Sequence, residues 1–380
     1  MQTVTSSRCA VSFDTLPAVA DRRARRINAL GEKLAAEKID ALLLSSLPNI
    51  RYLTGFSGTS ALVLATRSET LLITDFRYET QVADEVGDVA KVRIEPVSLW
   101  AGLWDMLQRI QTVEVIGFES SHLVHRDFQR LLNDGSRWQW RPQLNVVESL
   151  RESKDADEVA LIAEAARIAT SALSRIIPDL RSGRSELAVA GFLEKALRDE
   201  GSEEAPFPPI VASGPRSALP HARASTREIQ RGDFLLIDFG AQYHGYCSDV
   251  TRTFVVGVPT SEQREIYAVV RDANHIASHS VRAGMTGMAA DALARSYIER
   301  HGHGEAFGHS LGHGLGLEVH ESPRLARTAE AALVTGAVVT IEPGIYRPGW
   351  GGVRIEDDVH LSENGPQILT NFSRELIEVE

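Results

Sequence analysis

Histidines and carboxylates gather in the second half of this 380-residue chain. Ten of the 12 histidines lie beyond residue 200, and several stand in short segments that also carry aspartate or glutamate. Clustered imidazoles and carboxylates are typical of a metal site. Four segments hold such residues in patterns that suit metal binding: 234–254, 307–321, 338–346 and 352–360.

The segment 234–254 predicts a β-hairpin, because two apolar strands flank a turn near His244. With the turn midpoint placed between Tyr243 and His244, Asp238 and Asp249 face each other across the ladder. Directly opposed carboxylates repel each other. A cation between them is one interpretation, and two aspartates that face solvent are the other.

His309 and His313 in the segment 307–321 are four residues apart, so they share a face in a helix and in a strand. The glycines around them oppose a helix and indicate extended backbone that approaches another group closely. A surface loop rich in His and Gly is the alternative. These glycines are Gly308, Gly312, Gly314 and Gly316.

In the segment 338–346 a β-branched strand ends at Glu342, and Pro343-Gly344 forces a turn that holds this carboxylate at the rim of a sheet. A surface glutamate is the plainer interpretation.

In the segment 352–360 polar and apolar residues alternate, which predicts one strand with one polar face. That face carries Arg354, Glu356, Asp358 and His360.

Together the four segments offer two aspartates, two glutamates and a histidine. This carboxylate-rich set suits a hard or borderline divalent ion, Mn²⁺ or Co²⁺, better than a thiolate-bound zinc. Five such ligands can hold two ions about 3.5–4 Å apart. Four negative charges in so small a space require a similar amount of positive charge beside them.

The elements that position these residues fall into two parts. The first half alternates helix and strand and predicts an α/β domain over residues 21–150, after a flexible arm over residues 1–20. The charged segment 151–158 marks the boundary, and residues 151–380 predict an α+β domain with a largely antiparallel sheet. Strands are expected at 41–46, 60–65, 70–74, 91–96 and 113–118, and helices at 22–38, 78–86, 158–177, 261–281 and 289–301.

Composition excludes several classes of protein. The net charge of −11 opposes nucleic-acid binding through a broad basic face. Two cysteines, Cys9 and Cys247, exclude a disulfide scaffold and favour a reducing compartment. No stretch reaches the roughly 20 apolar residues that a membrane span needs, and no signal-peptide pattern is present. We expect a cytoplasmic protein.

At these residues the sequence strongly resembles the pita-bread metallopeptidases: aminopeptidase P, prolidase and methionine aminopeptidase. The likeness covers residues 20–376. The first half is similar to the creatinase-type domain of aminopeptidase P and prolidase at Asn49–Gly58 and Thr74–Tyr78. Methionine aminopeptidases lack this domain and are the weaker match. The resemblance implies an α/β N-terminal domain, followed by an α+β pita-bread catalytic domain with a mostly antiparallel sheet.

The resemblance also implies a ligand set for two divalent ions, Mn²⁺ first, with Co²⁺ or Zn²⁺ as alternatives. Asp238 would chelate one ion, Asp249 and Glu356 would bridge both, and His313 and Glu342 would complete the other site.

Five residues are implied to act on the peptide. A hydroxide between the two ions is the expected nucleophile, because the ions lower the pKa of water. Glu342 would shuttle its proton, His320 would stabilise the oxyanion, and His221 or His309 would orient the substrate. Arg354 matches a site arginine of the family.

The leading interpretation is an Xaa-Pro aminopeptidase, which releases the residue before a proline in second position. The alternative is a prolidase restricted to dipeptides. The two differ in whether the space beyond proline is closed and its carboxylate clamped, a role for which Arg354 is a candidate. A non-catalytic binding protein on the same fold is a remote third interpretation, since such relatives usually lose metal ligands. The resemblance implies a homodimer.

Overall fold

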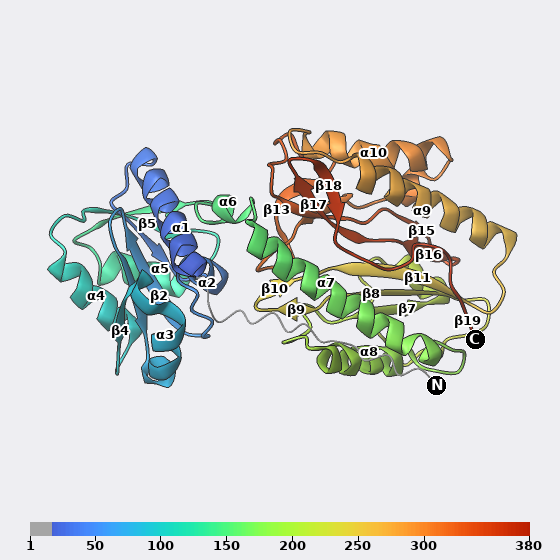
Figure 1. Ribbon diagram of the computed structural model, residues 1–380, viewed down its shortest axis with the longest axis horizontal. Coiled ribbons are helices and arrows are strands. Elements are labelled where there is room, and N and C mark those ends of the chain that lie inside the picture. The colour runs from blue at the N-terminus through green and yellow to red at the C-terminus, as the bar shows by residue number, and fades with distance from the viewer. Residues whose placement is uncertain (1–16) are drawn as a thin grey trace. The chain divides into compact units, whose positions relative to one another are not determined.

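The computed structural model describes residues 17–380. The chain divides between Leu150 and Arg151 into two compact units, which Figure 1 shows as ribbons. The predicted arm over residues 1–20 lies mostly outside the described residues, and helix α1 (Pro17–Ala36) begins within it.

The first unit is built on one mixed sheet with the strand order β4-β3-β2-β1-β5-β6. The five predicted strands of this half are present, and β1, β2 and β3 are almost wholly buried. Apolar side chains on both faces are typical of a sheet that is covered on both sides. The strands are β1 (Ala41–Leu44), β2 (Ala61–Thr66), β3 (Thr70–Thr74), β4 (Lys91–Ile94), β5 (Val115–Glu119) and β6 (Gln139–Gln143).

Helices pack around this sheet. The predicted helices at 22–38 and 78–86 correspond to α1 and α3, and the other helices are additions to the predicted elements. They are α2 (Leu47–Thr54), α3 (Glu79–Val86), α4 (Leu99–Arg109) and α5 (His125–Asn133), while α6 (Glu148–Arg151) lies at the division between the units.

The second unit has two helix pairs. Helix α7 begins with a capping box, in which the Asp155 side chain accepts the Glu158 N–H at 2.9 Å and the Glu158 side chain accepts the Asp155 N–H at 2.9 Å. The charged segment after residue 150 therefore starts this helix. The helices are α7 (Ala156–Ile176), α8 (Glu186–Glu200), α9 (Ser261–Ser280) and α10 (Gly287–Arg300).

Two sheets lie between these helix pairs. One has the order β19-β11-β8-β7 and is parallel only between β11 and β19, and the other, β13-β12-β14-β17-β18, is antiparallel throughout. Apolar side chains of α7 and α8 pack on the first sheet and those of α9 and α10 pack on the second. Figure 1 shows the helix pairs on opposite sides. The largely antiparallel character predicted for this half is confirmed.

The strands of the second unit are short, and two small hairpins, β9–β10 and β15–β16, accompany the sheets. Their bounds are β7 (Ile210–Ser213), β8 (Phe234–Phe239), β9 (Gln242–Tyr243), β10 (Tyr246–Cys247), β11 (Val250–Val256), β12 (Gly312–Gly314), β13 (Glu321–Leu325), β14 (Val338–Ile341), β15 (Gly344–Arg347), β16 (Gly351–Arg354), β17 (Asp357–Ser362), β18 (Gly365–Ile368) and β19 (Glu378–Val379).

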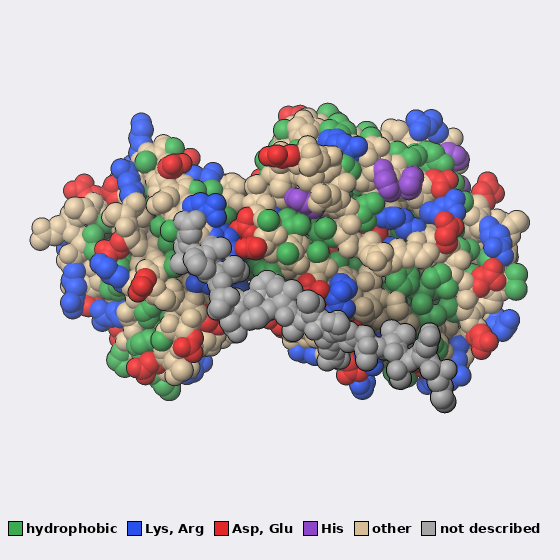
Figure 2. All heavy atoms as spheres, viewed as in Figure 1, with side chains coloured by type: hydrophobic (Ala, Val, Ile, Leu, Met, Phe, Trp, Pro, Cys, Tyr) green, Lys and Arg blue, Asp and Glu red, His purple; other side chains and the backbone are tan. Residues whose placement is uncertain are grey.

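The surface is charged and mixed. On the face drawn in Figure 2, acidic and basic side chains are interspersed over the described residues. Within the described part of the chain, no helix has the length and apolar character needed to cross a membrane.

Candidate metal centre

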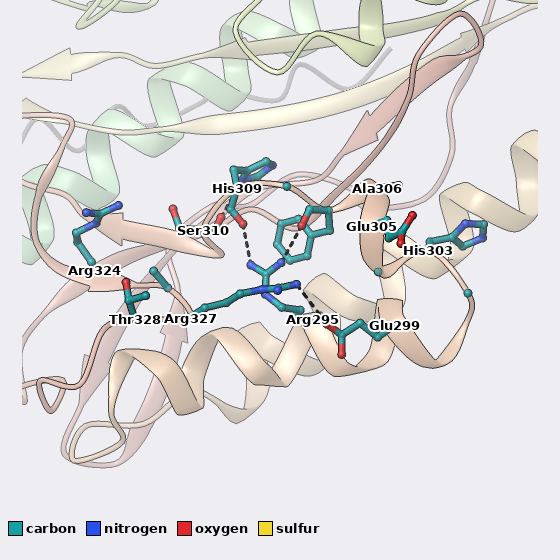
Figure 3. A pocket seen from close by; sticks show the side chains of 15 residues that line it. Arg295, Glu299, His303, Glu305, Ala306, His309, Ser310, Arg324, Arg327 and Thr328 are labelled. Carbon is teal, nitrogen blue, oxygen red and sulfur yellow. Dashed lines mark hydrogen bonds and ion pairs between the residues drawn. The ribbon is translucent and has the colours of Figure 1, made fainter.

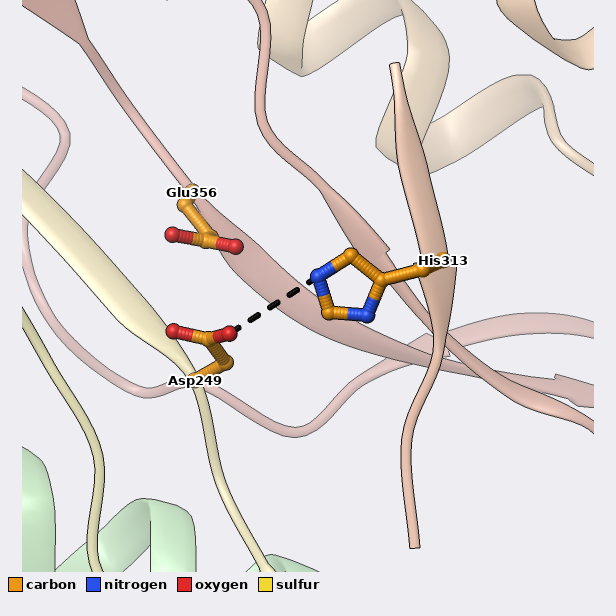
Figure 4. Close-up of side chains that lie close together, drawn as sticks. All are labelled: Asp249, His313 and Glu356. Carbon is orange, nitrogen blue, oxygen red and sulfur yellow. Dashed lines mark ion pairs between the residues drawn. The ribbon is translucent and has the colours of Figure 1, made fainter. Parts of the chain in front are cut away.

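Three of the predicted ligands come together where residues of both sheets meet. Asp249 precedes β11, His313 lies in β12, and Glu356 follows β16. One ligand atom from each lies within 4.8 Å of those from the other two, and His313 Nε2 is 3.8 Å from Asp249 Oδ2. Figure 4 shows the three side chains pointing toward one another. Segments far apart in the sequence therefore converge on one point.

The other two predicted ligands border this group. Glu342 follows β14, and its Oε1 is 3.5 Å from His313 Nε2. Asp238 lies in β8, and its charge adds to burial and to other carboxylates in raising the pKa of Asp249 and Glu356. All five residues thus lie in one mostly buried region. Their role as metal ligands stays a prediction.

The carboxylates in this region repel one another. Burial and the charges of Glu356 and Asp238 raise the pKa of Asp249 well above its ordinary value, and burial with the charge of Glu342 does the same for Glu356. Burial raises the pKa of Glu342 to about 8. Asp238 Oδ1 and Asp249 Oδ1 are buried and have no hydrogen-bond partner among the described residues. A divalent cation would satisfy these oxygens and offset the charge, so the residues fit a metal.

The register of the hairpin differs from the prediction. Asp238 lies opposite Thr251, so the prediction that it faces Asp249 directly is wrong by two residues. The turn is centred between His244 and Gly245, whose φ angles of 47° and 79° suit a two-residue turn. Since side chains alternate with period two, a shift of two residues leaves both aspartates on one face as diagonal neighbours. The pair still borders one site.

The segment 352–360 is not the single strand that its alternation predicts. β16 ends at Arg354, and β17 starts after Glu356 in a different sheet. This break places Arg354 and Glu356 at the junction of the sheets. Asp358 is fully buried instead of lying on an open polar face, and its Oδ2 accepts the N–H of Asp249 at 3.1 Å.

A chain of hydrogen bonds joins His309 to Asp238. His309 Nδ1 is 2.8 Å from the carbonyl oxygen of Ser310, so Nδ1 carries the proton, and Nε2 accepts from the Tyr346 hydroxyl at 2.9 Å. The Tyr346 oxygen accepts from Arg354 Nη1 at 2.8 Å, and Arg354 Nη2 donates to Asp238. Burial and the Arg354 charge lower the pKa of His309 to about 4, in accord with a neutral ring.

Two residues of this network were missed in the sequence. Tyr346 is buried, which raises its pKa to about 12, and a buried tyrosine hydroxyl needs a partner. The sequence feature that could have identified Tyr346 is its position four residues after the predicted ligand Glu342. The hydroxyl of Thr251 accepts from Arg354 Nε at 3.0 Å and donates to Glu356 at 2.5 Å. Only the register of the sheet reveals that threonine.

His320 and His221 are the solvent-exposed members of the predicted catalytic residues. Both side chains are exposed, and the His320 ring centroid is 4.2 Å from that of His313. Burial lowers the pKa of His309 and of His320, and the charge of His221 lowers both further. His221 therefore lies near the other two. Exposed imidazoles beside a cluster of potential ligands can reach a substrate.

Comparison with known proteins agrees with this geometry. Residues 160–363 match metallopeptidase family M24, and residues 26–153 match the creatinase/prolidase N-terminal domain. The chain belongs to metallopeptidase family M24. The predicted resemblance to the pita-bread metallopeptidases, and with it the fold class, is confirmed.

Relatives of this M24 chain include proteins with two named activities. An Xaa-Pro dipeptidase of Pyrococcus horikoshii is 38% identical over 354 residues, which cover 93% of this chain and 98% of that protein. Among solved structures, an Xaa-Pro dipeptidase from Bacillus anthracis has 39% identity and a TM-score of 0.90, covering 94% of this chain and 100% of that one. An X-Pro aminopeptidase from Thermotoga maritima has 36% identity and a TM-score of 0.85, covering 92% and 100%.

Proposed function

We propose that this M24 peptidase is an Xaa-Pro dipeptidase that binds two divalent ions, Mn²⁺ first, through the five predicted ligands. The metal site is supported by the group of crowded, mostly buried carboxylates around His313, whose pKa burial lowers to about 4. The dipeptidases among its relatives support the substrate, and they favour this activity over the aminopeptidase expected from the sequence. The aminopeptidase stays the second candidate, because the Thermotoga maritima protein bears that name. The ligands are Asp238, Asp249, His313, Glu342 and Glu356.

The side chains around this site suit peptide hydrolysis. When bound, divalent ions lower the pKa of water and polarise a peptide carbonyl. Glu342 lies 3.5 Å from His313, at the edge of the proposed ligand set, and its carboxylate can accept a proton from the attacking water and pass it on. His320 is exposed beside His313 and can donate a hydrogen bond to the developing oxyanion. His221 is exposed close by and can hold the substrate.

Arg354 is poorly placed to clamp a substrate carboxylate. It is buried, and its donors go to Asp238, Tyr346, Thr251 and the carbonyl of Pro220. Its role is to hold the residues around it.

Arg324 is better placed for that contact. It is exposed and lies opposite His313 in the β12–β13 ladder, so the two side chains share a face. Within the described part of the chain, no carboxylate pairs with its guanidinium. Together with His309 it lines an open pocket of about 1140 Å³ (Figure 3). We assign Arg324 to the carboxylate of the C-terminal proline.

The test compares Ala-Pro, its amide and Ala-Pro-Ala on Mn²⁺-loaded protein, with products identified by mass spectrometry. We expect cleavage of Ala-Pro. Arg324→Met should raise KM for Ala-Pro by about 10–100-fold, the equivalent of a lost charged hydrogen bond of about 1.5–3 kcal/mol, and should leave the amide unaffected. Arg327→Met is the matched control, since Arg327 lines the same pocket and pairs with Glu299.

The other outcomes are equally clear. Release of alanine and Pro-Ala from the tripeptide would establish the aminopeptidase. If none of the three is cleaved while two metals stay bound, the proposed substrate is wrong. Loss of bound metal on purification, with no cleavage after Mn²⁺ is restored, would support a non-catalytic binding protein. We further propose that the protein is a cytoplasmic homodimer, which light scattering of the purified protein and fractionation of cells would test.

A further inference from the structure

A buried ion pair on helix α10 lies beneath the segment that carries His309. Asp291 and Arg295 are one turn apart, and their side chains are 2% and 7% exposed. Arg295 Nε and Nη2 donate to the two oxygens of Asp291 at 2.5 and 2.7 Å. This two-point contact is the geometry that holds an arginine most firmly. Neither residue belongs to the predicted ligand or catalytic set.

The other hydrogen bonds of this pair go to the backbone of residues 307–311. Arg295 Nη1 donates to the Phe307 carbonyl at 2.8 Å, and Nη2 donates to the His309 carbonyl at 2.7 Å. Asp291 Oδ1 accepts the N–H of Leu311 at 3.0 Å. The guanidinium also lies 4.0 Å from the centre of the Phe307 ring. Figure 3 shows Arg295 reaching from α10 to these carbonyls. One ion pair thus fixes three alternate residues.

The ends of this segment, Phe307 and Leu311, are buried in the core, and Leu311 also pairs with the backbone of Leu325 and Glu342. The open pocket of Figure 3 borders residues 302–310. A Cβ atom added at Gly308 would have no neighbour within 4 Å. Between these ends, residues 308–310 border the pocket, and the bond from Arg295 to the His309 carbonyl holds their backbone.

The segment ends at the site. The His309 side chain meets Tyr346, and His313 lies two residues beyond Leu311. We propose that Asp291 and Arg295 are positioning residues of the peptidase site, which set where His309 stands relative to His313. This inference rests on the proposed function. An error of about 1 Å in such a position can lower a rate about 100-fold.

The test uses Arg295→Met, with Arg300→Met as the matched control on the same helix, where the exposed Arg300 lies near Tyr297. Hydrogen exchange by mass spectrometry on peptides that span 305–315 measures how firmly this backbone is held, independently of activity. We expect faster exchange in Arg295→Met and none of this change in Arg300→Met. Arg295→Lys keeps the positive charge beside Asp291 but loses the two-point contact of the guanidinium. It replaces Arg295→Met in this test if the methionine variant does not fold.

A double-mutant cycle measures the consequence for catalysis. Arg295→Met should lower kcat at least about tenfold with bound metal unchanged, and should change kcat less than about threefold when His309→Ala is already present. Unchanged exchange, or an equal loss of kcat in both backgrounds, would overturn the proposal. If the wild-type protein hydrolyses no Xaa-Pro peptide, the proposed function fails, and hydrogen exchange alone still decides whether the ion pair holds the segment.

Discussion

Without metal, the buried carboxylates of the site should destabilise the protein increasingly as the pH rises. Burial raises the pKa of Glu342 to about 8, and burial with neighbouring charge raises the pKa of Asp249 and Glu356 well above their ordinary values. A carboxyl group with a higher pKa in the folded state holds its proton more tightly there. Its protonation therefore favours folding at low pH, and that advantage is lost as the pH rises toward the folded-state pKa.

The size of the effect follows from the pKa shift. For Glu342 the shift runs from an ordinary value of 4.5 to about 8. At about 1.4 kcal/mol per pKa unit, this group alone should lower the free energy of unfolding by about 3 kcal/mol between pH 5 and pH 8. That is a large share of the roughly 5–15 kcal/mol typical of a folded protein. Bound divalent ions should reverse the trend, because they bind the deprotonated carboxylates.

The assay is urea unfolding of EDTA-dialysed protein at pH 5, 6, 7 and 8, with and without Mn²⁺. Glu342→Gln should remove the Glu342 contribution, so that the metal-free variant gains on wild type as the pH rises and is about 3–4 kcal/mol more stable at pH 8. Glu194→Gln, at an exposed position on α8, is the control. Burial also lowers the pKa of His309 and His313 to about 4, which opposes the trend below about pH 7, so the comparison of the two proteins decides. If Glu342→Gln has the same pH dependence as wild type, Glu342 holds no extra proton in the folded state and the reasoning is refuted.

Three further perturbations have defined outcomes. Tyr346→Phe removes the hydroxyl that bonds His309 Nε2 and Arg354 Nη1, so it should lower the free energy of unfolding by about 1–3 kcal/mol and lower kcat, with metal content by mass spectrometry unchanged. His313→Ala should reduce bound metal and abolish the rise in melting temperature that Mn²⁺ gives the wild type. Gly312→Ala would drive a Cβ atom into the carbonyl of Thr340, whereas Gly308→Ala has open space; urea unfolding should show a loss of about 1–3 kcal/mol for the first alone.

The sequence was informative where chemistry and local pattern coincide. The four segments rich in His, Asp and Glu do meet at one site, and Glu342 follows its strand as Pro343-Gly344 predicts. The glycines around His313 allow close backbone approach, since a Cβ at Gly312 or Gly314 would strike a neighbouring carbonyl. Gly308 does not fit that interpretation. Predictions from such patterns hold because they depend on a few residues and their immediate neighbours in the sequence.

The predictions that were wrong, and the contacts that were missed, depend on geometry beyond the local sequence pattern. One residue of error in the turn midpoint moved the hairpin register by two, because both strands shift together. The break between Arg354 and Asp357 is invisible to alternation, since the apolar residues on either side keep the same parity. The contacts of Arg295 join residues that only the packing of α10 brings together.

Two acids of the site, Asp238 and Glu356, are each held by a hydrogen bond that leads back to Arg354. Asp238 accepts from Arg354 at Oδ2, and its Oδ1 has no partner among the described residues. Glu356 accepts from the Thr251 hydroxyl, which in turn accepts from Arg354. One buried guanidinium thus orients Asp238 directly and Glu356 through Thr251, and it supplies part of the positive charge that they need. Such orientation fixes a ligand before the ion arrives, which is why the carboxylates can stay crowded in the folded chain.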